Sequence, residues 1–346
     1  MGFSRRNILA VSMAALTSGC YHARAPNLLE QDAGVTFEPF DGEFSQIIDV
    51  GATPRIISNG HLWAEGPAWD GERQRLYFTD VPRNRAYSWS DAGGIAVFLD
   101  PSGIAPEQAL GMREPGANGL LLSRSGKLLI CNHGLRAVEA LDFRSGERQV
   151  LVSEYGAQRF NSPNDLIEAS DGTIYFTDPP YGLEGLNDSA LKEMEVNGVY
   201  RIDTDGQSSR LVEDMTFPNG VALSPDEKWL YVSQSDPEAP LIRRYAISEG
   251  ELQNPGGEKA WFDARRFMHP VGGLPDGMAV TAQGYVLLAG PGGVLVITAS
   301  GECLGRIATG KPTANCAFGE DGRTLFITAS DRLIAVRTKV TGLGQF

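Results

Sequence analysis

The sequence predicts an all-β protein, a six-bladed β-propeller of four-stranded antiparallel blades around a central channel. In six places a polar residue is followed by alternating apolar residues, a turn and a strongly β-prone run, which is the pattern of a β-hairpin. The six starts are about 40 to 57 residues apart, the length expected of one four-stranded blade. The polar residues that open the repeats are Glu65, Asn118, Asn164, Asn219, Asp276 and Asn315.

The third repeat, residues 160–182, shows the pattern in its clearest form. Its sequence is FNSPNDLIEASDGTIYFTDPPYG, in which Asn164 opens the unit and Gly172 marks the turn before the run TIYFT. Gly126 and Gly284 mark the turn in two other repeats, and Glu227 stands at this position in a fourth. Glycine is favoured at such turns because it adopts a positive φ angle without steric cost.

The first 34 residues precede the predicted propeller. Residues 1–19 combine a twin-arginine start with a short apolar stretch, the pattern of a Tat-type signal peptide that is too short to span a membrane. Residues 20–34 follow as a tether, and Thr17-Ser18-Gly19-Cys20 resembles a lipoprotein cleavage box. We expect a periplasmic protein, with anchoring through a lipidated Cys20 as an open alternative, and one propeller domain over residues 35–346.

Residues 35–57 form a β-rich piece ahead of the first repeat. A ring of blades is usually closed by pairing a strand from one chain end with the blade made by the other end, because an unpaired edge strand promotes aggregation. We therefore expect this segment to pair with residues 333–340 of the last blade.

Charge and cysteine content restrict the partners and the cross-links. The formal net charge is −13, which makes nucleic acid an improbable partner. Cys303 and Cys316 fall in the same repeat and could form a disulfide in an oxidising compartment. The alternative is that both are free packed thiols, as expected for Cys131.

The propeller topology predicts where polar side chains meet. The innermost strands of all blades begin on the same face, so the six opening residues surround one mouth of the channel. The second strand of each blade returns to that face about fourteen residues later, so we expect further polar residues at the rim. These are Asp80, Asn132, His133, Asp178 and Ser233.

Four of the opening residues suit a metal ion. Glu65 and Asp276 supply carboxylates, and Asn164 and Asn219 supply amide oxygens, a set that favours calcium. Mg²⁺, Mn²⁺ and Zn²⁺ are the other divalent candidates, and the alternative is that these residues only hydrogen-bond channel water. Such an ion would polarise an ester or lactone carbonyl for attack by water. The sequence contains no GxSxG motif, which argues against a covalent acyl-enzyme.

At these positions the chain resembles the SMP-30/gluconolactonase/LRE-like family of calcium-dependent sugar lactonases, over about residues 60 to 340. The motifs that carry the resemblance are EGP (65–67), NGLLLSRSGKLLICNHG (118–134), NSPNDL (161–166), DGTIYFTDPPYG (171–182), PNGVALSPDE (218–227) and PDGM (275–278).

The resemblance implies roles for individual residues. The metal ligands would be Glu65, Asn164, Asn219 and Asp276. The general base would be Asp276 or Asp165, with Asp165 alternatively orienting Asn164. The residues expected to contact substrate are Asn118, His133, Arg136 and Tyr181.

We therefore expect an exported lactonase that opens D-glucono-1,5-lactone to gluconate. Two alternatives remain, a calcium-dependent esterase or organophosphatase of the same fold and a non-catalytic sugar-binding propeller of the cell envelope. The polar predicted rim favours sugars. The sequence leaves the oligomeric state open.

Overall fold

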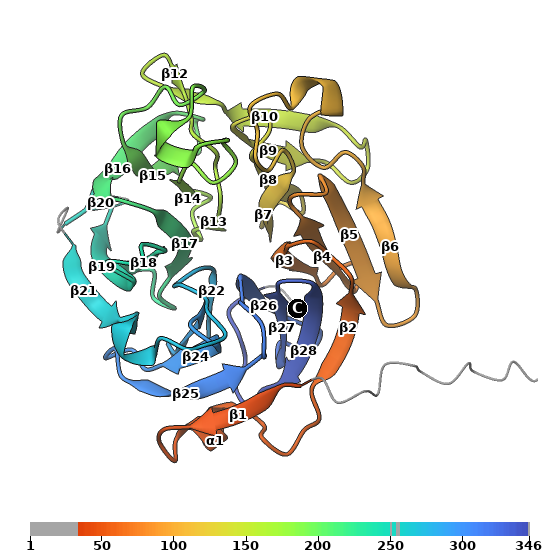
Figure 1. Cartoon of the computed structure of the whole chain (residues 1–346), viewed down its shortest axis with the longest axis vertical. Coiled ribbons are helices and arrows are strands. Elements are labelled where there is room, and N and C mark those ends of the chain that lie inside the picture. Colours follow the sequence, from red (N-terminus) through yellow and green to blue (C-terminus); the bar gives the residue numbers. More distant parts are fainter. Residues whose placement is uncertain (1–33, 250, 254–256, 345–346) are drawn as a thin grey trace, which may run out of the picture.

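The computed structural model describes residues 34–249, 251–253 and 257–344. Six antiparallel sheets are arranged as blades around a central channel (Figure 1), so the predicted six-bladed propeller is confirmed. The predicted signal peptide and all but the last residue of the predicted tether lie outside the described residues. Within the described part of the chain, no helix has the length and apolarity needed to cross a membrane.

Each blade is a meander whose first strand lies nearest the channel (Figure 1). The first blade contains β3 (Ala64–Asp70), β4 (Arg75–Asp80), β5 (Arg85–Ser90) and β6 (Gly94–Leu99). The second contains β7 (Ala117–Leu122), β8 (Leu128–Asn132), β9 (Ala137–Leu141) and β10 (Arg148–Val152). The third contains β13 (Leu166–Glu168), β14 (Ile174–Asp178), β15 (Asn197–Ile202) and β16 (Ser208–Met215).

The second half of the ring repeats this arrangement with added short strands. The fourth blade contains β17 (Pro218–Leu223), β18 (Trp229–Gln234), β19 (Leu241–Ser248), β20 (Glu251–Leu252) and β21 (Glu258–Asp263). The fifth contains β22 (Met278–Val280), β23 (Val286–Gly290), β24 (Gly293–Ile297) and β25 (Cys303–Ala308). The sixth contains β26 (Asn315–Gly319), β27 (Thr324–Ala329) and β28 (Arg332–Arg337).

A few short elements lie outside the blades. They are the small hairpin β11 (Glu154–Tyr155) and β12 (Gln158–Arg159), the helix α1 (Phe44–Ile47), and three 3₁₀ turns at Pro106–Gln108, Leu186–Asp188 and Ala264–Phe267. The hairpin turns follow the sequence pattern. Gly172 has a φ angle of 91° and Glu227 one of 54°, so both adopt the left-handed conformation expected at the turn.

The N-terminal segment closes the ring in two places rather than one. Strand β2 (Arg55–Asn59) pairs antiparallel with β28 and completes the sixth blade, and Ile48 forms a bridge to Thr338, as predicted. Strand β1 (Thr36–Pro39) instead pairs with β25 and adds a fifth strand to the fifth blade. The prediction that residues 35–57 pair with the last blade was therefore wrong for residues 36–39, because a β-rich pattern does not specify which edge a strand joins.

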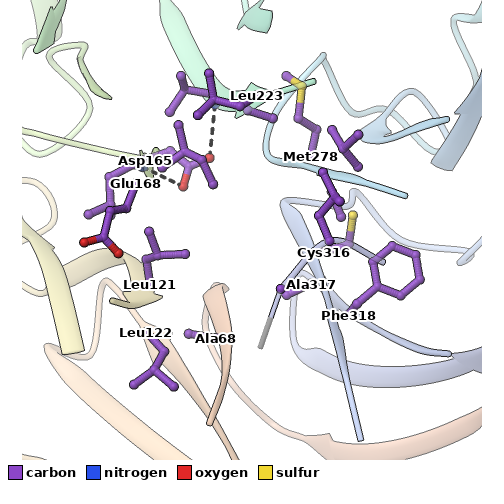
Figure 2. Close-up of a pocket in the computed structure, with 18 of the residues that line it drawn as sticks. Ala68, Leu121, Leu122, Asp165, Glu168, Leu223, Met278, Cys316, Ala317 and Phe318 are labelled. Atoms are coloured by element: carbon purple, nitrogen blue, oxygen red, sulfur yellow. Dashed lines mark hydrogen bonds between the residues drawn. The ribbon is translucent and has the colours of Figure 1, made fainter. Parts of the chain in front are cut away.

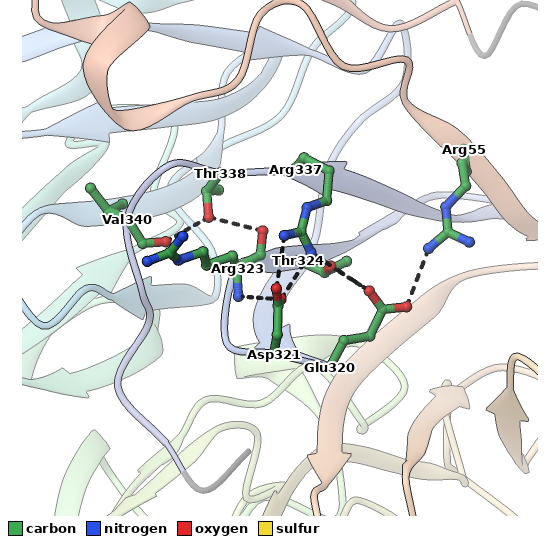
Figure 3. Close-up of polar contacts among 8 residues, drawn as sticks. All are labelled: Arg55, Glu320, Asp321, Arg323, Thr324, Arg337, Thr338 and Val340. Carbon is green, nitrogen blue, oxygen red and sulfur yellow. Dashed lines mark hydrogen bonds and ion pairs between the residues drawn. The ribbon is translucent and has the colours of Figure 1, made fainter.

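Polar contacts on the surface accompany this closure (Figure 3). Arg55 of β2 contacts Glu320 at 3.2 Å, and Arg337 of β28 pairs with Asp321 at 2.9 Å. These side chains are well exposed, so each ion pair contributes little to stability, about 0 to 1 kcal/mol. The backbone ladder of β2 and the apolar core beneath it therefore stabilise the closure more than the ion pairs do.

The core is divided into apolar clusters between neighbouring blades. Between the second and third blades, Phe176 and Tyr200 stack with ring centroids 5.4 Å apart, and Phe160 packs edge-on against both. Cys131 is buried in the same cluster as a free thiol. Cys303 and Cys316 are also free, which is the second of the two alternatives that the sequence left open.

Candidate functional site

The opening residues are brought together by close contact between neighbouring inner strands. Each of Glu65, Asn118, Asn219 and Asp276 is followed by glycine, and these glycines face the opening residue of the next blade. A Cβ atom added at Gly220 would lie 2.2 Å from the Asp276 carbonyl oxygen, and one at Gly66 would lie 2.1 Å from that of Asn118. Only glycine permits this approach, so the recurring glycine sets the diameter of the ring at this mouth.

Hydroxyl groups on the second strands hold the opening residues in place. Thr177 donates to the Asn219 carbonyl oxygen at 2.6 Å, and Ser233 donates to that of Asp276 at 2.8 Å. Each bond joins one blade to the next. Ser233 was predicted to lie at the rim, but it is a buried strand residue, because its hydroxyl is used between blades. The sequence contained a signal for this role that was not recognised. A hydroxyl residue follows the opening residue by thirteen or fourteen positions in three repeats, as Thr79, Thr177 and Ser233.

The residue after that hydroxyl fixes the chain entering the blade. Asp178 accepts hydrogen bonds at 2.8 Å from the backbone N–H groups of Asn161 and Ser162, three and two residues before Asn164. Asp80 accepts from the N–H groups at the equivalent two positions before Glu65. Asp80 and Asp178 were predicted as rim residues; both are fully buried and position the ligand strands instead, because their carboxylates are occupied by backbone donors.

The four predicted metal ligands lie at this mouth, and three of them are buried. Glu65, Asn164 and Asn219 are at most 5% exposed, and Asp276, which lies just before β22, is partly exposed. The Asn219 side-chain amide donates to Ser235 Oγ at 2.8 Å and also hydrogen-bonds Asp276. With its N–H groups used in this way, the carbonyl oxygen of Asn219 remains as an acceptor for a cation.

The electrostatics of the mouth favour a cation. Burial raises the pKa of Glu65 to about 8, with a further contribution from the charge of Asp165. Burial also raises the pKa of Asp276 well above its ordinary value, and the nearby charges of Glu65 and Asp165 add to this. Buried carboxylates that repel one another are stabilised by a divalent ion. The donor set therefore fits a hard cation such as calcium.

The donor set contains only two carboxylates and two amides. In the part of the chain that the structure describes, no group of three or more His, Cys, Asp or Glu side chains is arranged to hold a metal ion. A site at this mouth would consequently rely on the amide oxygens of Asn164 and Asn219. Oxygen-only coordination of this kind is typical of calcium rather than of structural zinc.

Asp165 faces away from this mouth. Its carboxylate accepts from the Leu166 N–H at 3.0 Å and from the Val221 N–H of the next blade at 3.3 Å. It lines a cavity of about 410 Å³ at the opposite end of the channel, with apolar walls that include Leu121 and Met278 (Figure 2). Burial raises the pKa of Asp165 to about 7. These contacts occupy the Asp165 carboxylate with backbone donors, and its role as base or as a support for Asn164 stays a prediction.

Asn118 and His133 form a hydrogen-bonded pair. The Asn118 side-chain nitrogen lies 3.3 Å from His133 Nε2, and His133 is fully buried. Burial lowers the pKa of His133 to about 3, assisted by the positive charge of Arg113. His133 is therefore a neutral imidazole whose Nε2 accepts from Asn118.

Arg136 and Tyr181 differ in their surroundings. The Arg136 guanidinium donates to the carbonyl oxygens of Phe160 and Arg159 and pairs with Glu193, so its observed contacts are with the protein. The Tyr181 ring stacks on Phe217 with centroids 5.9 Å apart. Burial raises the pKa of the Tyr181 hydroxyl, which also interacts with the charge of Asp276. The substrate contacts expected of both residues stay predictions.

Three residues near the mouth were missed from the sequence. Trp63 is half-buried, and its side chain hydrogen-bonds Glu65. Glu114 lies 3.8 Å from His133 Nδ1 and 3.1 Å from the Arg113 guanidinium. Trp63 was predictable in principle, since it stands two residues before Glu65 and alternate strand residues share a face. Arg113 and Glu114 lie in a long loop outside the repeat pattern, which gave no signal.

Comparison with known proteins agrees with this architecture. Residues 63–331 match the SMP-30/Gluconolactonase/LRE-like region. The chain is 40% identical to a gluconolactonase of Zymomonas mobilis over 338 residues, covering 97% of this chain and 95% of that protein. The solved structure of a gluconolactonase from Xanthomonas campestris is 31% identical with a TM-score of 0.74, covering 88% of this chain and 95% of that chain.

A more distant structure shares the fold. The calcium-binding protein regucalcin of Agrobacterium tumefaciens is 17% identical with a TM-score of 0.66, over 84% of this chain and 95% of that chain. The ring of six blades with polar residues at one mouth defines a β-propeller of the lactonase type. This chain belongs to the SMP-30/gluconolactonase/LRE-like family.

Proposed function

We propose that this protein is a lactonase, a carboxylic ester hydrolase that opens sugar lactones of the D-glucono-1,5-lactone type. The observation that carries the proposal is the set of two carboxylates and two amides at one mouth of the channel, three of them buried. The similarity to gluconolactonases over almost the whole chain supports the choice of substrate.

Glu65, Asn164, Asn219 and Asp276 would hold the cation, with calcium as the expected ion. When bound, the ion supplies electrophilic polarisation of the lactone carbonyl. The calcium-binding relative of the same fold supports this assignment.

The protein's own groups account for proton movement and orientation. Asp276 is the group that accepts the proton of the attacking water at its carboxylate, since it lies beside Glu65 and Asn219 at this mouth. Asp165 is directed to the opposite end of the channel and holds the inner strands in register. Asn118 is oriented by His133 so that its carbonyl oxygen is available to a substrate hydroxyl.

We further propose that the protein acts in the periplasm. The support is the twin-arginine pattern of residues 1–19. Anchoring through a lipidated Cys20 remains the alternative form of the exported protein.

The proposal is tested by acid release from D-glucono-1,5-lactone in a pH-stat, with the spontaneous rate subtracted. Wild-type protein with calcium is expected to exceed the background, and chelation with EDTA is expected to remove the excess. D276N should abolish turnover, whereas D165N should retain measurable activity if Asp165 acts only as a support. An exposed control, D188N, should behave as wild type. Equal rates for wild type and D276N would refute the proposal.

A further inference from the structure

Two long loops meet above the mouth and are fastened to each other by their backbones. The Arg113 and Glu114 N–H groups both donate to the Gly182 carbonyl oxygen, at 2.9 and 3.2 Å. The Glu184 N–H donates to the Gly111 carbonyl oxygen at 2.9 Å. The backbone of Glu114 is thus held at a fixed position beside the loop that carries Tyr181.

The Glu114 carboxylate is mostly enclosed and lies among site residues. Its side chain is only 13% exposed. One oxygen lies 3.1 Å from Arg113 and the other 3.8 Å from His133 Nδ1. Its charge also acts on Glu65, which places it on the same side of the channel as the proposed metal ligands. None of the steps proposed above uses this carboxylate.

A second observation points from the protein to a ligand at the same place. Because His133 Nε2 accepts from Asn118, the proton of the neutral ring is on Nδ1. Among the described residues, this fully buried Nδ1 makes no hydrogen bond of ordinary geometry, although the Glu114 backbone lies close enough to act on the pKa of His133. Buried donors are seldom left unpaired, so a partner atom is expected beside Nδ1.

A sugar hydroxyl satisfies both groups at once. The hydroxyl can accept from His133 Nδ1–H and donate to the Glu114 carboxylate. A hydroxyl oxygen about 2.8 Å from each of these two groups is compatible with the 3.8 Å that separates Nδ1 from the carboxylate oxygen. We propose that Glu114 is a specificity-determining residue that, together with His133 Nδ1, binds a ring hydroxyl of the lactone. The enzyme therefore selects hydroxylated lactones over unsubstituted rings of the same size. This inference rests on the proposed function and deepens it.

The test compares two lactones with six-membered rings at saturating calcium, D-glucono-1,5-lactone with ring hydroxyls and δ-valerolactone without them. In E114Q, kcat/KM for gluconolactone should fall about 10- to 100-fold, the loss expected for a hydrogen bond to a charged group. The value for δ-valerolactone should change less than about threefold. The matched control is E184Q, an exposed glutamate on the neighbouring loop, which should change neither. Because the ratio of the two substrates is compared, a reduced folded fraction does not alter the result.

Other outcomes are decisive in either direction. An equal fall on both lactones, or no fall on either, would overturn the inference while leaving the proposed function intact. If wild-type protein opens neither lactone, the proposed function fails by itself. Glu114 is then judged by calorimetric binding of 1,5-anhydro-D-glucitol, a cyclic polyol that lacks the carbonyl. Weaker binding to E114Q than to wild type supports the inference, and equal binding contradicts it.

Discussion

Replacing Asp178 should loosen the strand that presents the ligand Asn164. Asp178 uses one carboxylate oxygen for the Asn161 N–H and the other for the Ser162 N–H, both at 2.8 Å and both buried. D178A leaves two buried donors unpaired, at about 1 to 3 kcal/mol each, so stability should fall by about 2 to 6 kcal/mol. D178N keeps one acceptor oxygen and should lose about half as much.

The second effect of these variants concerns the metal site. Groups that orient metal ligands typically contribute about 10- to 100-fold to metal affinity, so D178A should bind calcium more weakly by a factor in this range. Urea unfolding gives the stability, and calorimetric titration with calcium gives the affinity. Both are run at about pH 8, since burial raises the pKa of Asp178 to about 7 and the carboxylate is then ionised.

D188N provides the matched control, because Asp188 is an exposed aspartate between β14 and β15 of the same blade. It makes the same change of charge and should alter neither quantity. If D178A unfolded at the wild-type urea concentration, or bound calcium with wild-type affinity, the positioning role given to Asp178 would be wrong.

Three further predictions follow from the same contacts. Because the pKa of buried His133 falls from 6.5 to about 3, the unfolded chain takes up this proton first as the solution is acidified. As the pH is lowered below about 6.5, the free energy of unfolding of the wild type should therefore decrease more steeply than that of H133Q, by up to about 1.4 kcal/mol per pH unit. Urea unfolding at several pH values measures this difference. Parallel curves for the two proteins would contradict the prediction. G220A should lower activity and reduce the free energy of unfolding by more than about 2 kcal/mol, since its Cβ would lie 2.2 Å from the Asp276 carbonyl oxygen. The control G42A, whose Cβ would meet no atom within 4 Å, should leave stability unchanged. Similar melting curves for the two variants would refute the steric argument. A chain starting at residue 60 lacks β1 and β2 and should aggregate or fail to fold. A chain starting at residue 35 keeps both strands and should melt at the same temperature as the full chain. A stable propeller from the chain starting at residue 60 would refute the role of these strands in closing the ring.

The repeat pattern made the fold predictable because each blade carries its own signal. Polar starts, turn residues and β-prone runs are local features, and six copies leave few other arrangements. The convergence of Glu65, Asn164, Asn219 and Asp276 followed from the topology. The blade that β1 joins could not be predicted from the repeat pattern, since the choice between two free sheet edges depends on contacts distant in sequence.

The site was less predictable where function depends on side-chain direction. Asp165 stands next to Asn164, yet its carboxylate points to the far end of the channel, because adjacent residues on an extended segment face opposite ways. Asp80 and Asp178 were expected to face the mouth as the last residues of their strands. Their backbone partners lie 16 to 18 residues earlier in the chain, and a repeat pattern does not reveal such pairings.

The measurement closest to the central claim is a crystal structure of the active protein with calcium, in which anomalous scattering locates the ion. We expect one site at the mouth, with side-chain oxygens of Glu65, Asn164, Asn219 and Asp276 at about 2.3 to 2.6 Å from the ion. A fully active protein whose ion lies elsewhere, or that carries no ion at this mouth, would contradict the account.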